Sequence, residues 1–215
     1  GRPGDALPTP TAFHLEELLD LMKRYGMTPA KKIWETESGI MYPATSYTNL
    51  SEVSPKYPVS GEDAAVYLVR HYVHLLSSSV DKWFYYHLFV SHQSDRREGA
   101  GFFEWDGSPR PLAAAYAVLS RTIGDCSFVE KIRRGSDVSG AVFQNKEKKV
   151  TVLFQNSLSP DAPVLIPVEP KDNVVITDIM GKTIAPDRGG RGFQVPVLQY
   201  PVYITEHLAD PAQTN

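Results

Sequence analysis

The feature that most constrains this sequence is a change in its hydrophobic pattern part-way along the chain. Residues 11 to about 124 alternate segments of helical period with short apolar runs, an order typical of alternating helices and strands. From about Val138 onward, short β-branched runs separated by turn residues are typical of antiparallel strands. The pattern predicts an α/β part with right-handed winding, followed by a small antiparallel β-sandwich, with a boundary between 125 and 138.

Three segments of the first part have the periodicity of helices. Residues 11–25 place apolar side chains on one stripe and acidic ones opposite, and Gly26 ends the pattern. Ser60 to Asp63 has the spacing of a capping box, and apolar residues follow at helical intervals up to Leu76. A third helix is predicted from the apolar side shared by Leu112, Tyr116, Leu119 and Ile123.

The apolar runs between these helices are short enough to be strands. Lys31 to Gly39 is an aromatic and β-branched run whose polar downstream end is expected to open into a loop. Trp83 to Val90 is almost continuously apolar and aromatic, which predicts a parallel strand covered on both faces. In the second part, strands are expected at 150–154, 164–168, 174–177, 193–197 and 202–205.

Charge and composition exclude several kinds of partner. The 215 residues carry 22 basic and 25 acidic side chains, a formal net charge of −3, with no basic run to attract a nucleic acid. No uninterrupted apolar stretch reaches the ~18 residues that a membrane-spanning helix requires, so no membrane is expected as a partner. Cys126 is the one cysteine and cannot form an internal disulfide, which leaves the compartment open, secretion and the periplasm included.

Two carboxylates at the end of the first predicted strand are the candidate chemistry. Because side chains alternate along a strand, Glu35 and Glu37 are expected to share one face with Ile33. If that face is the interior of a barrel, both carboxylates enter one site, and each must be hydrogen-bonded or functional to offset its burial. Two solvated glutamates on an edge strand fit the spacing equally well.

The motif around these carboxylates resembles that of a known group of enzymes. The run Ile33 to Gly39 has the order hydrophobic-Trp-x-Thr-Glu-x-Gly, which resembles the seventh-strand nucleophile motif of the clan of retaining (β/α)8-barrel glycoside hydrolases. The helix from Ala64 to Arg70 is similar to that clan's seventh helix, and the run from Trp83 to Phe89 to its eighth strand.

The downstream segments continue the resemblance in the same order. Asp106-Gly-Ser-Pro-Arg-Pro111 resembles the start of the clan's eighth helix. The tail, with Asp178 to Gly181 and Pro201 to Ile204, is similar to the β-sandwich that follows the barrel in family 39. Each motif alone is moderately specific, so the resemblance depends on the ordered set, which spans nearly the whole chain.

This resemblance implies both an architecture and a reaction. Residues 1–130 are expected to hold strands seven and eight and helices six to eight of a barrel, and residues 131–215 the β-sandwich. Glu37 is implied to be the nucleophile of a retaining hydrolysis of O-glycosidic bonds by double displacement. The clan's acid/base glutamate lies at the end of strand four, usually after an asparagine, and this chain contains no Asn-Glu pair. Glu35 lies beside Glu37 on the same strand, so a supporting or substrate-binding role is expected for it.

A complete barrel of this type takes about 250 residues, and two strands cannot close one. Their outer edges are left unpaired, which is a hazard for solubility. We therefore expect the chain to be the C-terminal piece of a longer enzyme, or one chain of a split enzyme, and inactive alone. The expected partners are a missing N-terminal barrel segment or chain and a carbohydrate substrate.

Four further residues are expected at the sugar, and each also fits a simple packing role. Tyr42 and Trp105 are loop aromatics that can stack on a pyranose ring, while Tyr86 and His87 stand at the mouth of the last barrel strand. His71 and His74 lie at i, i+3 on a helix, which permits metal ligation, but ordinary helix-face histidines are the better reading. We expect no metal and no cofactor.

A second function from another class stays open at this point. In it, the chain is a noncatalytic carbohydrate-binding or structural module whose sandwich does the work. Residues 139–205 contain no Trp, so few stacking platforms are available there.

Overall fold

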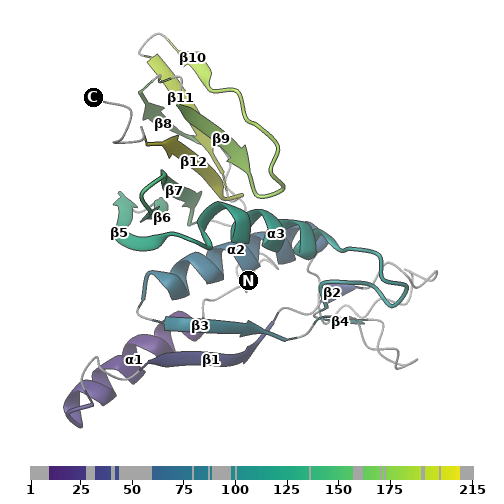
Figure 1. Cartoon of the computed structure of the whole chain (residues 1–215), viewed down its shortest axis with the longest axis vertical. Helices are drawn as coiled ribbons and strands as arrows, with labels where there is room; N and C mark the ends of the chain where they lie inside the picture. Colours follow the sequence, from purple (N-terminus) through teal and green to yellow (C-terminus); the bar gives the residue numbers. More distant parts are fainter. Residues whose placement is uncertain are drawn as a thin grey trace.

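The computed structural model describes residues 10–27, 32–39, 42–43, 60–78, 80–86, 88, 98–99, 101–135, 137–156, 162–169, 171, 173–189, 192–198 and 200–208. Figure 1 shows α2 and α3 between two groups of strands, and α1 beside β1. The elements of the first part are α1 (Pro10–Arg24), β1 (Ile33–Ser38), β2 (Tyr42–Pro43), α2 (Gly61–Leu76), β3 (Val80–Tyr85), β4 (Glu98–Gly99) and α3 (Pro111–Ile123). Those of the second part are β5 (Ser127–Arg134), β6 (Val138–Gln144), β7 (Lys148–Gln155), β8 (Val164–Val168), β9 (Val174–Asp178), β10 (Asp187–Gly189), β11 (Gly192–Val197) and β12 (Val202–His207).

The first part is built on a parallel β–α–β unit. β1 and β3 pair in parallel, and α2 connects them through the chain (Figure 1). Helix α2 begins as its capping box predicts: the Asp63 backbone N–H donates to Ser60 Oγ at 3.0 Å, and the Ser60 N–H donates to Asp63 Oδ2 at 3.3 Å. The predicted mixed α/β fold with parallel β–α units is confirmed, and so are the three predicted helices.

The second strand of this unit differs from its prediction. The predicted run was Trp83 to Val90, but β3 begins at Val80 and ends at Tyr85. The predicted coverage on both faces is also wrong within the described residues. Helix α2 packs on one face of the pair, whereas Trp34 and Phe84 are 51% and 46% exposed. A local apolar run indicates a strand, but only its tertiary neighbours decide how many of its faces are covered.

The second part consists of two antiparallel sheets. One has the order β5-β6-β7-β12-β9 and the other the order β10-β11-β8. The strands predicted from β-branched runs correspond to β7, β8, β9, β11 and β12, while β5, β6 and β10 were not predicted. Because β5 runs from Ser127 to Arg134, the expected division at residue 130 falls within one strand, and its place stays a prediction.

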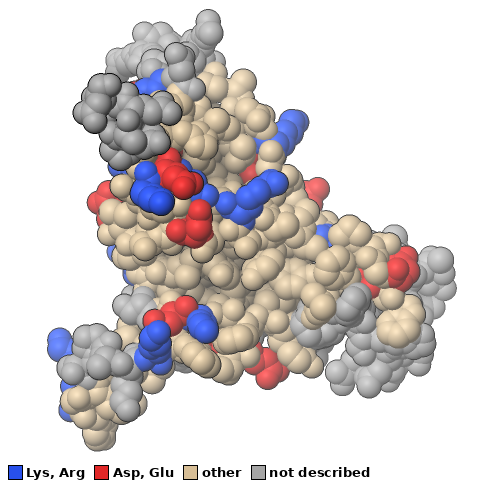
Figure 2. All heavy atoms as spheres, viewed as in Figure 1, with Lys and Arg blue, Asp and Glu red and all other residues tan. Residues whose placement is uncertain are grey.

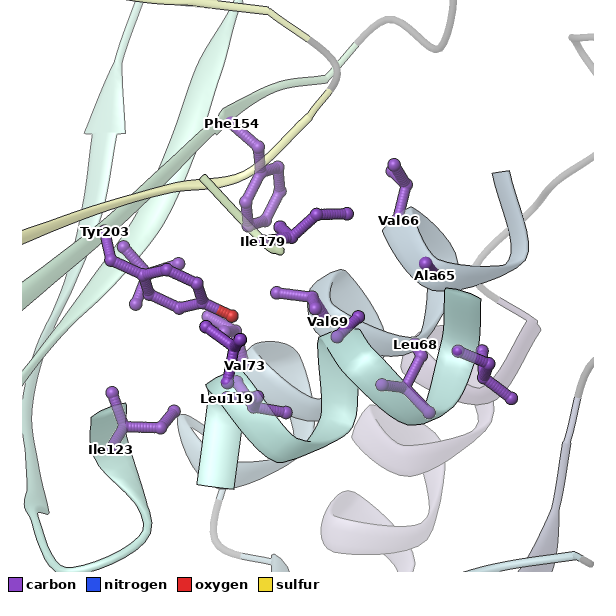
Figure 3. Close-up of a cluster of buried hydrophobic side chains, with 14 of the residues drawn as sticks. Ala65, Val66, Leu68, Val69, Val73, Leu119, Ile123, Phe154, Ile179 and Tyr203 are labelled. Atoms are coloured by element: carbon purple, nitrogen blue, oxygen red, sulfur yellow. The ribbon is translucent and has the colours of Figure 1, made fainter. Parts of the chain in front are cut away.

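The inner strands of the five-stranded sheet are buried on both faces, whereas the edge strand β5 is largely exposed. Alternation along β7 turns Val150, Val152 and Phe154 toward α2 and α3, and turns Leu153 toward the three-stranded sheet. Figure 3 shows the first of these interfaces, where Phe154, Ile179 and Tyr203 face side chains of the two helices. The helices therefore form a middle layer between the parallel β1–β3 pair and the five-stranded sheet.

A basic side chain also joins the helix layer to this sheet. Arg70 of α2 donates a hydrogen bond from Nη2 to the carbonyl oxygen of Asn156 at 3.1 Å, and its guanidinium lies 4.8 Å from the ring centroid of Phe154. Burial lowers the pKa of Arg70 to about 10. The side chain stays charged at neutral pH and ties α2 to the end of β7.

The phenol of Tyr203 is a buried polar group with no hydrogen-bond partner among the described residues. The residue is 0% exposed, its hydroxyl points into the apolar interface with the helices (Figure 3), and burial raises its pKa. Removing an unsatisfied hydroxyl removes a desolvation cost of about 1–3 kcal/mol. We expect Tyr203→Phe to unfold in urea at the same midpoint or a higher one. A free energy of unfolding lowered by more than about 1 kcal/mol, a typical net hydrogen-bond contribution, would show that the hydroxyl is bonded.

Candidate active site

The candidate site lies at the C-terminal ends of β1 and β3. Both arrows point the same way in Figure 1, toward β2 and β4. Ser38 pairs with Tyr85 at this end, so Glu37 and Tyr86 lie at the same edge of the two-stranded sheet. In parallel β–α folds the loops at this edge carry the functional groups, because the helices occupy the other surfaces.

Glu35 faces the helix layer. It pairs across the strands with Trp83, whose ring packs edge-on against His71 and Tyr72 of α2. Oε1 of Glu35 lies 3.3 Å from Nε2 of His71, and the two side chains are 15% and 2% exposed. A polar pair between a strand and a helix is tolerated because each group satisfies the other.

An irregularity in β1 separates the two carboxylates. Glu35 pairs with Trp83 and Ser38 with Tyr85, so β1 advances from 35 to 38 while β3 advances only from 83 to 85. One extra residue on a strand is a β-bulge, in which two residues oppose one and the alternation of side chains shifts. Two residues of β1, Thr36 and Glu37, then stand against the single residue Phe84, and both are exposed. From this register we infer that Glu37 lies on the face away from α2, and not on the face of Glu35 as strict alternation predicts.

The face that receives Glu37 is aromatic and uncovered within the described residues. The rings of Trp34 and Phe84 lie 6.1 Å apart, centroid to centroid, and Nζ of Lys82 lies 4.9 Å from the Trp34 ring. Cations above an indole face are stabilised by the ring quadrupole. Glu37 thus stands at the end of an exposed surface of two aromatic rings and one ammonium group.

A tight hairpin follows the end of β3 and carries Trp105. The backbone N–H of Phe103 donates to the carbonyl oxygen of Leu88 at 3.0 Å, and that of Glu104 donates to the carbonyl oxygen of Ser108 at 2.8 Å. Gly107 takes the left-handed conformation that the turn requires, with φ 85°. The indole of Trp105 is 58% exposed at the tip, so the hairpin presents it to solvent near the candidate site.

A buried ion pair stabilises this hairpin. Nε of Arg110 lies 3.2 Å from Oε1 of Glu104, with side chains 1% and 4% exposed. Nη1 of Arg110 also donates to the carbonyl oxygen of Gly101 at 3.1 Å. Both residues lie in or beside the Asp-Gly-x-Pro-Arg-Pro motif, so the basic position of that motif holds the loop in shape.

The remaining predicted sugar contacts are only partly placed. Tyr86 is 55% exposed next to β3. Tyr42 lies in β2, which pairs with β4, but its side chain is outside the described residues, as is the whole of His87. The roles expected for Glu35, Glu37, Tyr42, Tyr86, His87 and Trp105 remain predictions.

Sequence reasoning missed the partnership of His71 with Glu35. We weighed His71 only as a metal ligand or an ordinary helix-face residue. The available signal was its place in a helix with buried residues on more than one side, where a polar group needs a partner. The buried Glu104–Arg110 pair was missed too, because nothing in its spacing distinguishes it from a solvated pair.

A hollow in the surface lies away from this site, between β8 and β9. It has a volume of about 340 Å³ and a mostly aliphatic lining that includes Val168, Val174 and Ile184. At its edge Lys171 donates to Glu206 Oε1 at 2.8 Å, a contact that raises the pKa of Lys171 and lowers that of Glu206.

Three observations limit other kinds of site. In the described ranges, no group of three or more His, Cys, Asp and Glu is arranged to hold a metal ion. None of the described helices has the length and apolar character needed to cross a bilayer. Figure 2 shows basic and acidic side chains interspersed on the displayed face, without a broad patch of one sign.

Solved structures share this architecture. A family 39 glycoside hydrolase from the gut symbiont Bacteroides cellulosilyticus WH2 superposes with a TM-score of 0.64 over 89% of this chain, at 18% sequence identity. The chain has a glycoside hydrolase-like fold. The structural resemblance to family 39 expected from the motifs is thus confirmed.

Two further matches extend the glycoside hydrolase-like fold to family 30. The family 30 subfamily 8 xylanase Xyn30A from Clostridium acetobutylicum gives a TM-score of 0.55 at 15% identity over 88% of this chain. An endoxylanase of family 30 from Clostridium papyrosolvens C71 gives 0.55 at 11% identity over 88%. The chain spans 37% of the family 39 protein and 45% of each xylanase. No protein-family model and no curated protein matches the chain in sequence.

Proposed function

We propose that this chain is the C-terminal part of a retaining glycoside hydrolase, with Glu37 as the nucleophile. The single observation that carries the proposal is the position of Glu37: it stands at the end of a parallel strand, where the register indicates the face that none of the described helices covers. In a (β/α)8 barrel the helices cover the outside, so that face becomes the interior, and the strand's end opens into the active site.

The proposed mechanism is the double displacement of retaining glycoside hydrolases. The Glu37 carboxylate attacks the anomeric carbon, the bond to the leaving oxygen breaks, and a covalent glycosyl–enzyme forms. A second carboxylic acid about 5–5.5 Å away gives its proton to the leaving oxygen and then activates water for the second displacement. Glu35 faces α2 and cannot serve as that acid, so we assign the acid to an upstream barrel segment. The chain alone is therefore inactive.

The free surfaces of the β1–β3 pair support the need for such a segment. Among the described residues each of these strands pairs only with the other, so each keeps an open edge. Open parallel edges and exposed rings such as Trp34 and Phe84 are unfavourable in water. Upstream strands that close the barrel would pair with both edges and cover the rings, and the two antiparallel sheets would be the trailing β-sandwich.

Carbohydrate is the proposed substrate class. Trp105 and Tyr86 are exposed next to the end of β3, where aromatic faces can stack on sugar rings. Tyr42 and His87 are further proposed contacts. Among the described side chains of the two antiparallel sheets, Phe128 is the only exposed aromatic one. The site at β1 and β3 is therefore the better candidate for sugar binding.

Reassembly of the barrel tests this proposal. We expect the chain alone to show no hydrolysis of activated aryl glycosides of either anomeric form. Coexpression with the upstream barrel segment should produce turnover, because it supplies the acid and closes the cleft. The measurement is release of the aryl group by both preparations. Turnover by the chain alone would contradict the assignment of the acid to an upstream segment. Tight polysaccharide binding without turnover by the reassembled protein would favour a noncatalytic carbohydrate-binding module instead.

A further inference from the structure

We infer that Glu35 is a positioning residue: by binding His71 of α2, it fixes the bulge in β1 that turns Glu37 onto the uncovered face. The catalytic consequence rests on the proposed function, whereas the anchoring of β1 does not. Of the two roles expected for Glu35, supporting and substrate-binding, this is the supporting one.

The side chain of His71 is tightly confined. Its ring is stacked on Tyr67, with centroids 5.4 Å apart and planes at 9°, and lies edge-on to Trp83 at 5.1 Å. The side chain is 2% exposed. An imidazole held between two aromatic rings cannot reorient freely, so its Nε2 presents a fixed polar atom to β1. Oε1 of Glu35 meets that atom at 3.3 Å.

Glu35 also has a particular place in the strand. It is the last residue of β1 in register with β3 before the irregularity, and the next pair is Ser38 with Tyr85. The anchor therefore lies directly before the extra residue. A slip of one residue in a strand moves the following side chains to the opposite face. Glu35 held on the helix side before the irregularity, together with the Ser38–Tyr85 pair after it, thus fixes on which face Glu37 emerges.

The position of Glu35 argues against the simpler role of a sugar contact. Glu35 is on the α2 side of the sheet, while Trp34 and Phe84 mark the other side. A ligand on the uncovered face would have to pass through the β1 backbone to reach this carboxylate. Its influence on a substrate is therefore exerted through the strand.

Hydrogen–deuterium exchange of the 215-residue chain tests the anchor directly. We expect Glu35→Ala to raise the exchange rate of the β1 amides about tenfold, the effect of losing one charged hydrogen bond, with α3 unchanged. Glu35→Gln should stay within about twofold of the wild type, because the amide still bonds the imidazole. Glu130→Ala, at an exposed position of β5, is the matched control. Equal β1 exchange in Glu35→Ala and Glu130→Ala would overturn the anchor.

Kinetics of the reassembled enzyme test the catalytic consequence. Glu35→Ala should lower kcat about 10- to 100-fold, as small misplacements of reacting groups do, with KM within about twofold. Glu35→Gln should recover most of that loss. A raised KM at unchanged kcat, or no recovery by Gln, would overturn positioning in favour of a sugar contact. Turnover that does not depend on Glu37 at all would instead overturn the proposed function, and the exchange experiment would still decide the anchor.

Discussion

Glu37→Gln in the reassembled barrel is expected to lower kcat for an activated aryl glycoside on the order of 10⁴-fold or more, the loss typical of removing a nucleophile. The amide has nearly the shape of the carboxylate but cannot attack the anomeric carbon. Because Glu37 is an exposed side chain, the same change should alter the free energy of unfolding by less than about 0.5 kcal/mol. Initial rates and a urea unfolding curve measure the two effects.

Two further variants make this result specific to the position of Glu37. Glu130→Gln removes an exposed carboxylate from β5 and should leave kcat unchanged. Glu37→Ala leaves a space that azide can enter, and attack by azide should restore release of the aryl group and form a glycosyl azide. Retention of more than a few per cent of the wild-type kcat by Glu37→Gln would remove Glu37 from the mechanism.

Phe143→Ala is expected to lower the free energy of unfolding by about 3–5 kcal/mol, the range for truncating a buried aromatic residue. Phe143 is 1% exposed in β6, and its cluster includes side chains of α2 and α3. All three tryptophans, at positions 34, 83 and 105, lie in the helix-containing part. If the shared core makes the chain one cooperative unit, tryptophan fluorescence should shift its urea midpoint together with the far-ultraviolet circular dichroism.

Phe128 provides the matched control for this experiment. Its ring lies 6.1 Å from that of Phe143, centroid to centroid, but the residue is 40% exposed. Phe128→Ala should therefore cost only about 1 kcal/mol, a usual value for a partly exposed site. If Phe143→Ala shifts only the circular dichroism transition, the helices and the five-stranded sheet unfold separately, and their common core contributes little to cooperativity.

The elements that local pattern could predict were those whose side chains follow one regular period. The helix beginning at Ser60 has both a capping box and apolar residues at helical spacing, and it was placed correctly. The runs in β7, β8 and β12 have β-branched residues bounded by turn residues, and they were placed as well. The end of β3 was not, because the apolar run continues past Tyr85 while strand pairing stops there.

The candidate site was predicted in its position along the chain and not in its geometry. The motif around Glu37 identified a strand end, and the structure has a strand end there. Strict alternation then placed Glu35 beside Glu37, because a single sequence shows no sign of an extra residue in a strand. The partnership of Glu35 with His71 spans 36 residues of sequence and could not be read from either segment alone.

By itself the sequence determined the three helices, the strand that carries Glu37, and the change from parallel to antiparallel pairing, since each depends on periods of a few residues. Only the tertiary structure decided which face Glu37 occupies, because the pairing of β1 with β3 sets the bulge. Tertiary structure alone also buried both faces of the inner strands of the five-stranded sheet, with helices on one side and β8 and β11 on the other. Burial is a property of neighbours distant along the chain, and no local pattern records them.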